Sequence, residues 1–219
     1  MNPLEKRSRP APWRRIFEER AQSFEEYVAS CAQRRSPARE AFHLQPLGRA
    51  ARRGGLLDRM RVQAEAFFGL PARVGDPLPM IDEGWAPERG RQNASILIDR
   101  LSGSRPADAL VYLAVVEEDL FARGLPWVFG EGNLTNGCGV LSLARLDSDV
   151  RAFKLMCHEG CHVLSIAHCT SGRCLMQGSN SLEEFDAAPA ELCPMDHRKL
   201  RWSTHPDVEF RVLAAARGA

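Results

Sequence analysis

The sequence has 219 residues, 44% of them hydrophobic, and a formal net charge of +1. A chain of this size and composition can bury one sizeable core, so we expect a single main domain. No apolar run is long enough to cross a membrane, and the first residues lack the apolar stretch of a signal peptide, which argues against a membrane or secreted protein and favours a cytoplasmic one.

The beginning of the chain is basic. Residues 1–61 contain 14 Lys and Arg against 7 Asp and Glu, whereas the remaining residues contain 15 against 21. A basic arm that binds nucleic acid is one interpretation. We favour a helix laid on the core, because acids interleave with the arginines and apolar residues recur at helical spacing. These apolar residues are Trp13, Ile16, Phe17, Phe24, Val28 and Cys31. We therefore predict a basic N-terminal helical extension over residues 1–55 and the main domain over 56–219, without a nucleic-acid partner.

Several elements can be predicted along the main domain. After a Pro-, Arg- and Gly-rich break from Ser36 to Gly55, apolar residues from Leu56 to Phe68 mark an amphipathic helix that ends at Gly69. A continuous apolar run over Ala109–Val116 is typical of a buried strand. Other predicted elements are strands at 72–74, 127–129 and 139–143, the end of a helix at 95–101, and a helix from 150 to about 164 capped by Ser148 or Asp149.

The last of these helices carries the most informative motif of the chain. It contains His158-Glu159-Gly160-Cys161-His162, and His168 follows. Residues i and i+4 share one face of a helix, so His158 and His162 can both point a ring nitrogen at one zinc ion. His168 would supply a third nitrogen, and Glu159 would accept a proton from a water on the metal. The motif predicts a zinc hydrolase centre.

Cysteines follow the third histidine. Cys169, Cys174 and Cys193 precede Asp196 and His197. The total of seven cysteines is odd, and clustered cysteines in a reducing cytosol are more often metal ligands than disulfides, so we predict a second, structural zinc site. The other cysteines suit a role as small core residues; they are Cys31, Cys138, Cys157 and Cys161.

The segment from His158 to Leu200 resembles the archaemetzincins, whose pattern joins HExxHxxGxxH to an adjoining cysteine, a CxM turn and a CPxC knuckle. The likeness is closest to the vertebrate branch, in CLMQGSNSLEE from Cys174 and in LCP from Leu192 followed by RKL from Arg198. Upstream, AVVEEDL from Ala114, FGEG from Phe129 and VLSLAR from Val140 are also similar. The resemblance covers residues 107–202.

The resemblance implies a role for each matched residue. His158, His162 and His168 would bind the catalytic zinc, with Glu159 as general base and acid. Met176 would be the methionine of the turn beneath the metal, where a soft thioether suits the floor of a histidine cage. Cys169, Cys174 and Cys193 would hold the structural zinc, which usually has four protein ligands.

Two positions depart from the family pattern. Ser165 stands where the glycine between the second and third histidines is expected, and a serine in a left-handed conformation costs on the order of 1 kcal/mol. Asp196 stands where the fourth cysteine of the knuckle is expected. Either Asp196 supplies an oxygen, or His197 supplies a nitrogen after a one-residue shift, or the second site is incomplete; zinc accepts all of these donor types.

The predicted fold is mixed α/β (α+β) and zincin-like, with a twisted mixed sheet over the active-site helix and a small irregular C-terminal subdomain. The resemblance implies the same arrangement. In such enzymes an edge strand walls the cleft and pairs with an extended peptide. The segment Gly139–Arg145 is our candidate for that strand; the alternative is an interior strand without substrate contact.

The predicted function is zinc-dependent peptide-bond hydrolysis, with a zinc-bound water activated by Glu159 and a peptide or protein as substrate. No tyrosine follows Tyr112, so a phenolic ligand cannot come from the Met-turn region. The alternative is a non-catalytic zinc-binding module, which Ser165 and the missing fourth cysteine favour.

Overall fold

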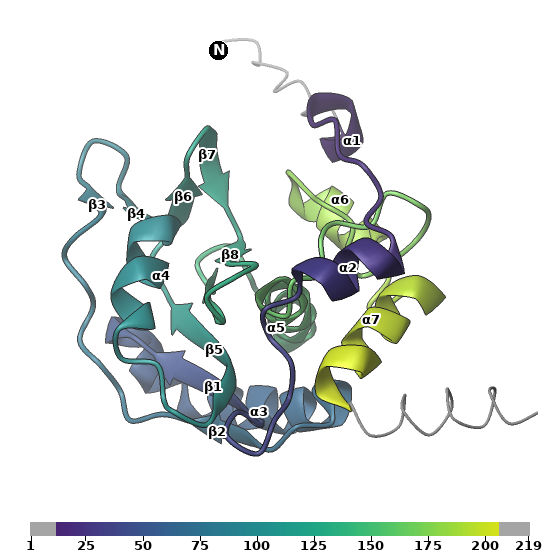
Figure 1. Ribbon diagram of the computed structural model, residues 1–219. Helices are drawn as coiled ribbons and strands as arrows, with labels where there is room; N and C mark the ends of the chain where they lie inside the picture. The colour runs from purple at the N-terminus through teal and green to yellow at the C-terminus, as the bar shows by residue number, and fades with distance from the viewer. Residues whose placement is uncertain (1–11, 206–219) are drawn as a thin grey trace, which may run out of the picture.

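The computed structural model describes residues 12–205 and contains two sheets (Figure 1). The larger sheet has the strand order β2-β1-β5-β9-β8; the first four strands run parallel, and β8 runs antiparallel to β9 at one edge. Its strands are β1 (Ala41–Pro46), β2 (Ala72–Val74), β5 (Ala109–Val116), β8 (Gly130–Gly132) and β9 (Cys138–Ser142).

Strand β5 runs through the middle of this sheet and is buried over its whole length. Its successive side chains point to opposite faces, as strand geometry requires. The core on one face takes residues 111, 113 and 115, and the core on the other takes residues 112, 114 and 116. The first face is covered by α3 (Gly54–Phe68) and α5 (Asp149–Val163), the second by α4 (Ala94–Ser102). Burial on both faces explains the continuous apolar run of this strand.

The smaller sheet stands beside β8. Its strands are β3 (Trp85–Ala86), β4 (Arg91–Asn93), β6 (Leu120–Ala122) and β7 (Leu125–Val128), in the order β3-β4-β6-β7. Asp119 fixes this sheet, because its carboxylate accepts two hydrogen bonds of 2.7 Å from Arg145 and one of 2.7 Å from Arg91. The Arg145 guanidinium also lies 4.3 Å from the centre of the Trp127 ring. The β6–β7 hairpin is therefore held in a defined position.

The prediction of one N-terminal helix was wrong. The structure has two short helices, α1 (Trp13–Ile16) and α2 (Phe24–Ser30). Ser23 begins the second one with a capping box, in which its hydroxyl accepts from the Glu26 backbone and the Glu26 carboxylate accepts from the Ser23 backbone. Residues Phe24 and Tyr27 are buried, whereas Ile16 and Val28 of the predicted stripe are exposed.

The C-terminal part is irregular and contains α6 (Leu182–Ala187) and α7 (Pro194–Thr204). Helix α7 packs against α2, and Tyr27 of α2 takes part in this contact. The Tyr27 hydroxyl donates to the carbonyl of Leu164 at 3.1 Å and is hydrogen-bonded to the Ser203 hydroxyl. Helices α2 and α7, which are far apart in the sequence, thus lie side by side next to α5, as Figure 1 shows.

The predicted mixed α/β fold, with a sheet over the motif helix and a small irregular C-terminal part, is confirmed. The helix over 56–68 and the strands at 72–74 and 109–116 are also confirmed. Strand β1 and the 3₁₀ helix at Gly48–Arg53 lie in the segment predicted as a break. The domain boundary at residue 55 stays a prediction; the sheet pairing crosses it, since β1 pairs with β2 and β5.

Between residues 12 and 205, no helix combines the length and the apolar character needed to cross a bilayer.

Ser148 caps helix α5, because its hydroxyl accepts a hydrogen bond from the backbone N–H of Arg151. Gly160 lets it approach its neighbours, because a Cβ there would lie 2.6 Å from the Phe68 ring and 3.0 Å from the Phe42 ring. The helix ends at Val163, and Ser165 reverses the chain with φ 68°. Ser165 therefore adopts the left-handed conformation that favours glycine. Its hydroxyl donates to the carbonyl of Leu134 at 2.6 Å, which compensates part of the strain.

We expect Ser165→Ala to be less stable than wild type by about 0.5–1.5 kcal/mol, because alanine keeps the strained dihedral and loses the hydrogen bond to Leu134. Ser165→Gly loses the same bond but relieves about 1 kcal/mol of backbone strain, so it should lie closer to wild type. Urea unfolding of the zinc-loaded proteins measures both. An alanine variant as stable as the glycine variant would contradict this account.

Candidate active site

Three histidines converge at the end of α5. His158 and His162 lie one turn apart on the helix, and His168 comes from the loop that Ser165 turns back. One ring nitrogen of each lies within 4.8 Å of those of the other two. The centre of the His168 ring lies 5.4 Å from that of the His158 ring and 4.8 Å from that of the His162 ring. The structure therefore brings together the three residues that the sequence predicted.

Each imidazole has its Nδ1 held by a hydrogen-bond acceptor. The Nδ1 of His158 contacts the carbonyl of Leu175 at 2.9 Å, and that of His162 contacts the carbonyl of Ile166 at 2.7 Å. A carbonyl oxygen only accepts, so Nδ1 carries the proton in both rings and Nε2 keeps its lone pair. This tautomer is the one that leaves Nε2 available as a metal ligand.

The two Nε2 atoms of His158 and His162 face each other across 3.0 Å. Burial, and then the charge of His168, lower the pKa of His158 to about 3, and burial also holds the pKa of His162 well below its usual range. Both rings are therefore neutral near pH 7, and two lone pairs meet without a proton between them. A cation between these nitrogens resolves the repulsion. This donor set, neutral imidazoles with fixed tautomers, fits zinc.

Glu159 lies beside the histidines and is only 4% exposed. Burial raises the pKa of this carboxyl well above its usual value, the charge of Glu131 raises it further, and the backbone N–H of Gly132 opposes the shift. Its Oε2 is buried and has no hydrogen-bond partner among the described residues. A buried oxygen without a partner is costly, so its position indicates a polar group that completes the site when it is loaded.

The histidines and Glu159 line a cavity of about 760 Å³. One wall comes from the β6–β7 hairpin and β8, and the opposite wall from Trp13, Phe17 and residues of the C-terminal part. The prediction that Gly139–Arg145 forms the edge wall was wrong. Strand β9 lies between β5 and β8, so the interior alternative holds, and β8 is the outer strand.

Two glycines allow β8 to lie directly on α5. A Cβ at Gly132 would lie 2.4 Å from the Cβ of His162, and one at Gly130 would lie 2.8 Å from the carboxyl carbon of Glu159. A side chain at Gly132 would collide with the backbone of α5, and one at Gly130 with the carbonyl of Val140 and the side chain of Glu159. The intervening Glu131 accepts a hydrogen bond of 2.9 Å from Ser95 on α4. The Gly-Glu-Gly sequence therefore sets the distance between the edge strand and the histidines.

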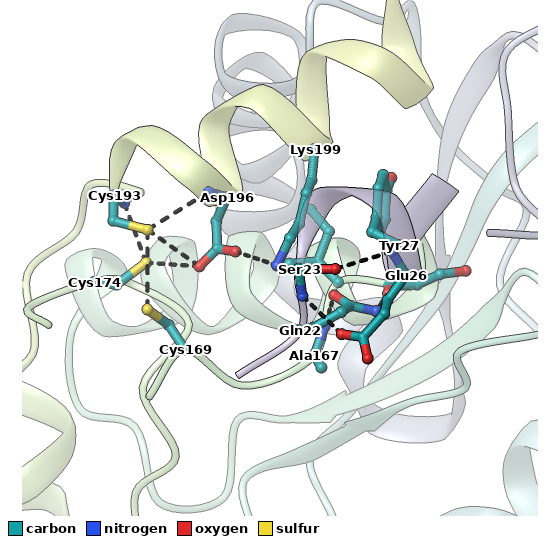
Figure 2. A network of polar contacts seen from close by, with 12 residues as sticks. Gln22, Ser23, Glu26, Tyr27, Ala167, Cys169, Cys174, Cys193, Asp196 and Lys199 are labelled. Atoms are coloured by element: carbon teal, nitrogen blue, oxygen red, sulfur yellow. Dashed lines mark hydrogen bonds and ion pairs between the residues drawn. The ribbon is translucent and has the colours of Figure 1, made fainter. Parts of the chain in front are cut away.

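The second predicted cluster also forms (Figure 2). Ligand atoms of Cys169, Cys174, Cys193 and Asp196 lie within 4.8 Å of one another. The Sγ atoms of Cys169 and Cys193 are 3.9 Å apart, and the carboxylate of Asp196 lies 3.3 Å from Cys174 Sγ and 3.4 Å from Cys193 Sγ. Three thiols and a carboxylate in this arrangement fit a closed, four-ligand zinc site.

Asp196 is 2% exposed and belongs to this cluster, whereas His197 points to the exposed side of α7. The second carboxylate oxygen of Asp196 accepts a hydrogen bond of 2.9 Å from Lys199, whose side chain is 3% exposed. A buried ammonium needs a partner of opposite charge. Lys199 therefore holds the carboxylate with its other oxygen toward the thiols.

Met176 is fully buried. Its carbonyl accepts a hydrogen bond of 2.7 Å from the backbone N–H of Cys169, and the carbonyl of the preceding Leu175 holds His158. The turn thus links the histidine site to the cysteine cluster. The cysteines predicted as core residues are buried at 138, 157 and 161, and Cys31 packs against the core.

Sequence reasoning missed the contribution of the N-terminal segment. Glu19 contacts Nδ1 of His168 at 2.7 Å, and Trp13 lies edge-on to the His168 ring with the centres 5.2 Å apart. Burial by itself raises the pKa of Glu19, but the hydrogen bond and charge of His168 outweigh it and leave that pKa below its usual value. No local motif signals this contact, because Glu19 and His168 are 149 residues apart.

The family model described as peptidase family M54 matches residues 106–202. Archaemetzincin-2 of Macaca fascicularis is 26% identical over 265 residues, which cover 95% of this chain and 72% of that protein. Archaemetzincin of Methanocaldococcus jannaschii is 33% identical over 149 residues, which cover 61% of this chain and 81% of that protein.

Solved structures show the same fold. The crystal structure of archaemetzincin from Methanopyrus kandleri superposes with a TM-score of 0.68 at 25% identity, over 77% of this chain and 97% of that one. The archaemetzincin from Archaeoglobus fulgidus, complexed with malonate, gives a TM-score of 0.63 at 26% identity, over 73% of this chain and 99% of that one. With two metal-binding clusters in place, the chain belongs to the archaemetzincins, peptidase family M54, and is a zinc-dependent metallopeptidase.

Proposed function

We propose that His158, His162 and His168 bind the catalytic zinc and that Glu159 is the general base and acid of peptide hydrolysis. The observation that carries this proposal is the juxtaposition of two facing imidazole lone pairs with a buried oxygen of Glu159 that has no hydrogen-bond partner within residues 12–205. Zinc, when bound, acts as a Lewis acid and makes a water acidic enough to give up a proton near neutral pH.

The chain's own residues would divide the remaining work. Glu159 accepts the proton of the attacking water and returns it to the leaving amine. Leu175 and Ile166 hold the imidazole tautomers through their carbonyls, so that the ligand nitrogens keep their direction.

The proposed substrate is an extended peptide that lies along β8. This strand is the outer strand of the main sheet, and it lines the cavity beside the histidines. An extended chain can pair with the backbone of such an edge strand, and the pairing does not depend on side chains. The aromatic residues Trp127, Phe129 and Phe185 also line the cavity and suit apolar side chains of the peptide.

We also propose that Asp196 is the fourth ligand of a structural zinc and that the protein works in a reducing compartment, the cytoplasm. Asp196 is the residue that reaches the three thiols, whereas His197 is exposed. Thiols 3.9 Å apart, as in Cys169 and Cys193, remain available to a metal only while they stay reduced.

Glu159→Gln tests the general base. The amide fills the same space but cannot accept the proton, so we expect unchanged zinc content and a loss of at least about 100-fold in peptide cleavage, measured as kcat/KM on a peptide library. The matched control is Glu118→Gln, which removes another carboxylate with a buried, unpartnered oxygen outside the cavity. Cleavage by Glu159→Gln at the wild-type rate would eliminate the assigned base.

Asp196→Asn and His197→Asn test the fourth ligand. We expect wild type and His197→Asn to hold two zinc ions per chain, and Asp196→Asn to lose metal from the cysteine cluster, as metal analysis after dialysis would show. Asp196→Cys should retain both ions, which shows that any loss in the asparagine variant reflects a missing ligand. Loss of zinc from His197→Asn, with Asp196→Asn unaffected, would reverse the assignment.

A further inference from the structure

The third histidine is held differently from the other two. The Nδ1 atoms of His158 and His162 bond to backbone carbonyls 17 and 4 residues away. The Nδ1 of His168 instead bonds to a carboxylate oxygen of Glu19, 149 residues away, at 2.7 Å. Because this nitrogen is occupied, Nε2 is the atom of His168 that is left for zinc.

Glu19 is itself fixed in place. Its second carboxylate oxygen accepts a hydrogen bond of 3.0 Å from the indole Nε1 of Trp13. The backbone N–H of Trp13 donates to Glu184 at 2.8 Å, and its indole fits against Gly178, where a Cβ would lie 2.3 Å from Nε1. The carboxylate thus has both oxygens engaged, although 28% of the Glu19 side chain remains exposed. A supported carboxylate of this kind keeps its orientation toward the imidazole.

The same segment also clamps the loop that carries His168. The side-chain amide of Gln22 donates to the carbonyl of Ser165 at 3.1 Å and accepts from the backbone N–H of Ala167 at 3.2 Å, beside the cysteine cluster in Figure 2. Arg14 donates to the carbonyls of Cys169 and Gly172 at 3.1 and 3.2 Å. The loop would otherwise rely on the strained turn at Ser165.

We propose that Glu19 is a positioning residue of the catalytic zinc site, which orients His168 and strengthens it as a ligand. This inference rests on the proposed role of the three histidines. A carboxylate that accepts Nδ1–H fixes the tautomer and makes Nε2 a better donor to the metal. Glu19 lies outside residues 106–202, the part that the family model matches. The N-terminal segment is therefore part of the active site.

Zinc affinity of the three-histidine site tests this role independently of catalysis. The protein would be titrated with Zn²⁺ against a chelator, as wild type, Glu19→Ala, Glu19→Gln and Arg20→Ala. Arg20→Ala is the matched control, because it removes an exposed ion pair of the same segment, with Glu26, and contacts neither Glu19 nor the loop of His168. The visible spectrum of Co²⁺ in the same site reports the ligand geometry.

We expect Glu19→Ala to bind zinc about 10–100-fold more weakly, the usual effect of removing such a partner, with a changed Co²⁺ spectrum. Glu19→Gln keeps an acceptor oxygen and should be intermediate, and Arg20→Ala should stay within about twofold of wild type. Wild-type affinity in Glu19→Ala, or an equal loss in Arg20→Ala, would overturn the proposal.

The design separates the two proposals. A wild-type protein that binds zinc but cleaves no peptide would refute the proposed catalytic roles, and a weaker zinc affinity in Glu19→Ala would then still support Glu19 as a positioning residue. An active wild type, together with unchanged zinc affinity in Glu19→Ala, would support the catalytic roles and refute Glu19 as a positioning residue.

Discussion

The Nε2 atoms of His158 and His162 each carry a lone pair and face each other across 3.0 Å inside the protein. The rest of the site is arranged around the positive charge that these two lone pairs require. Each ring could relax if its Nδ1 were free to exchange the proton, but Leu175 and Ile166 prevent this. Protonation of one ring does not relieve the repulsion either, because an imidazolium buried here would lose its hydration. A divalent cation is the remaining solution, and it is the one that a hydrolytic enzyme uses.

This demand explains why the neighbouring elements pack so closely. Helix α5 needs Gly160 to lie against the rings of Phe42 and Phe68, and β8 needs Gly130 and Gly132 to lie against α5. The close approach of β8 brings an edge strand to the histidines, and the same approach leaves Glu159 without solvent. Packing and chemistry therefore depend on the same glycines.

The catalytic histidines could be predicted from the sequence because a helical turn relates His158 to His162, and this relation needs no knowledge of the fold. The choice between Asp196 and His197 as fourth ligand of the second site could not be predicted, because it depends on which side of α7 faces the thiols. Strand β1 was missed because its six residues include His43, Gln45 and Pro46, which interrupt the apolar pattern. Partners elsewhere in the chain satisfy the polar ones: His43 contacts Asp108 at 3.1 Å.

The break between α1 and α2 did leave a signal, since Ser23 and Glu26 form the capping box that begins the second helix. The wrong edge strand has a different cause. Strand β9 has the apolar sequence expected of any strand, whereas β8 consists of two glycines and a glutamate, so its pairing is set by the approach of α5 rather than by its own composition.

The contact of Tyr27 with Ser203 joins α2 to α7 beside the end of α5. During synthesis Tyr27 emerges from the ribosome long before Ser203, so the pieces that meet at α5 are complete only after residue 203 has been made. Formation of such distant contacts is a late event in folding, because a long loop must close first. The histidine site at the end of α5, which these distant segments cover, is therefore completed late in folding.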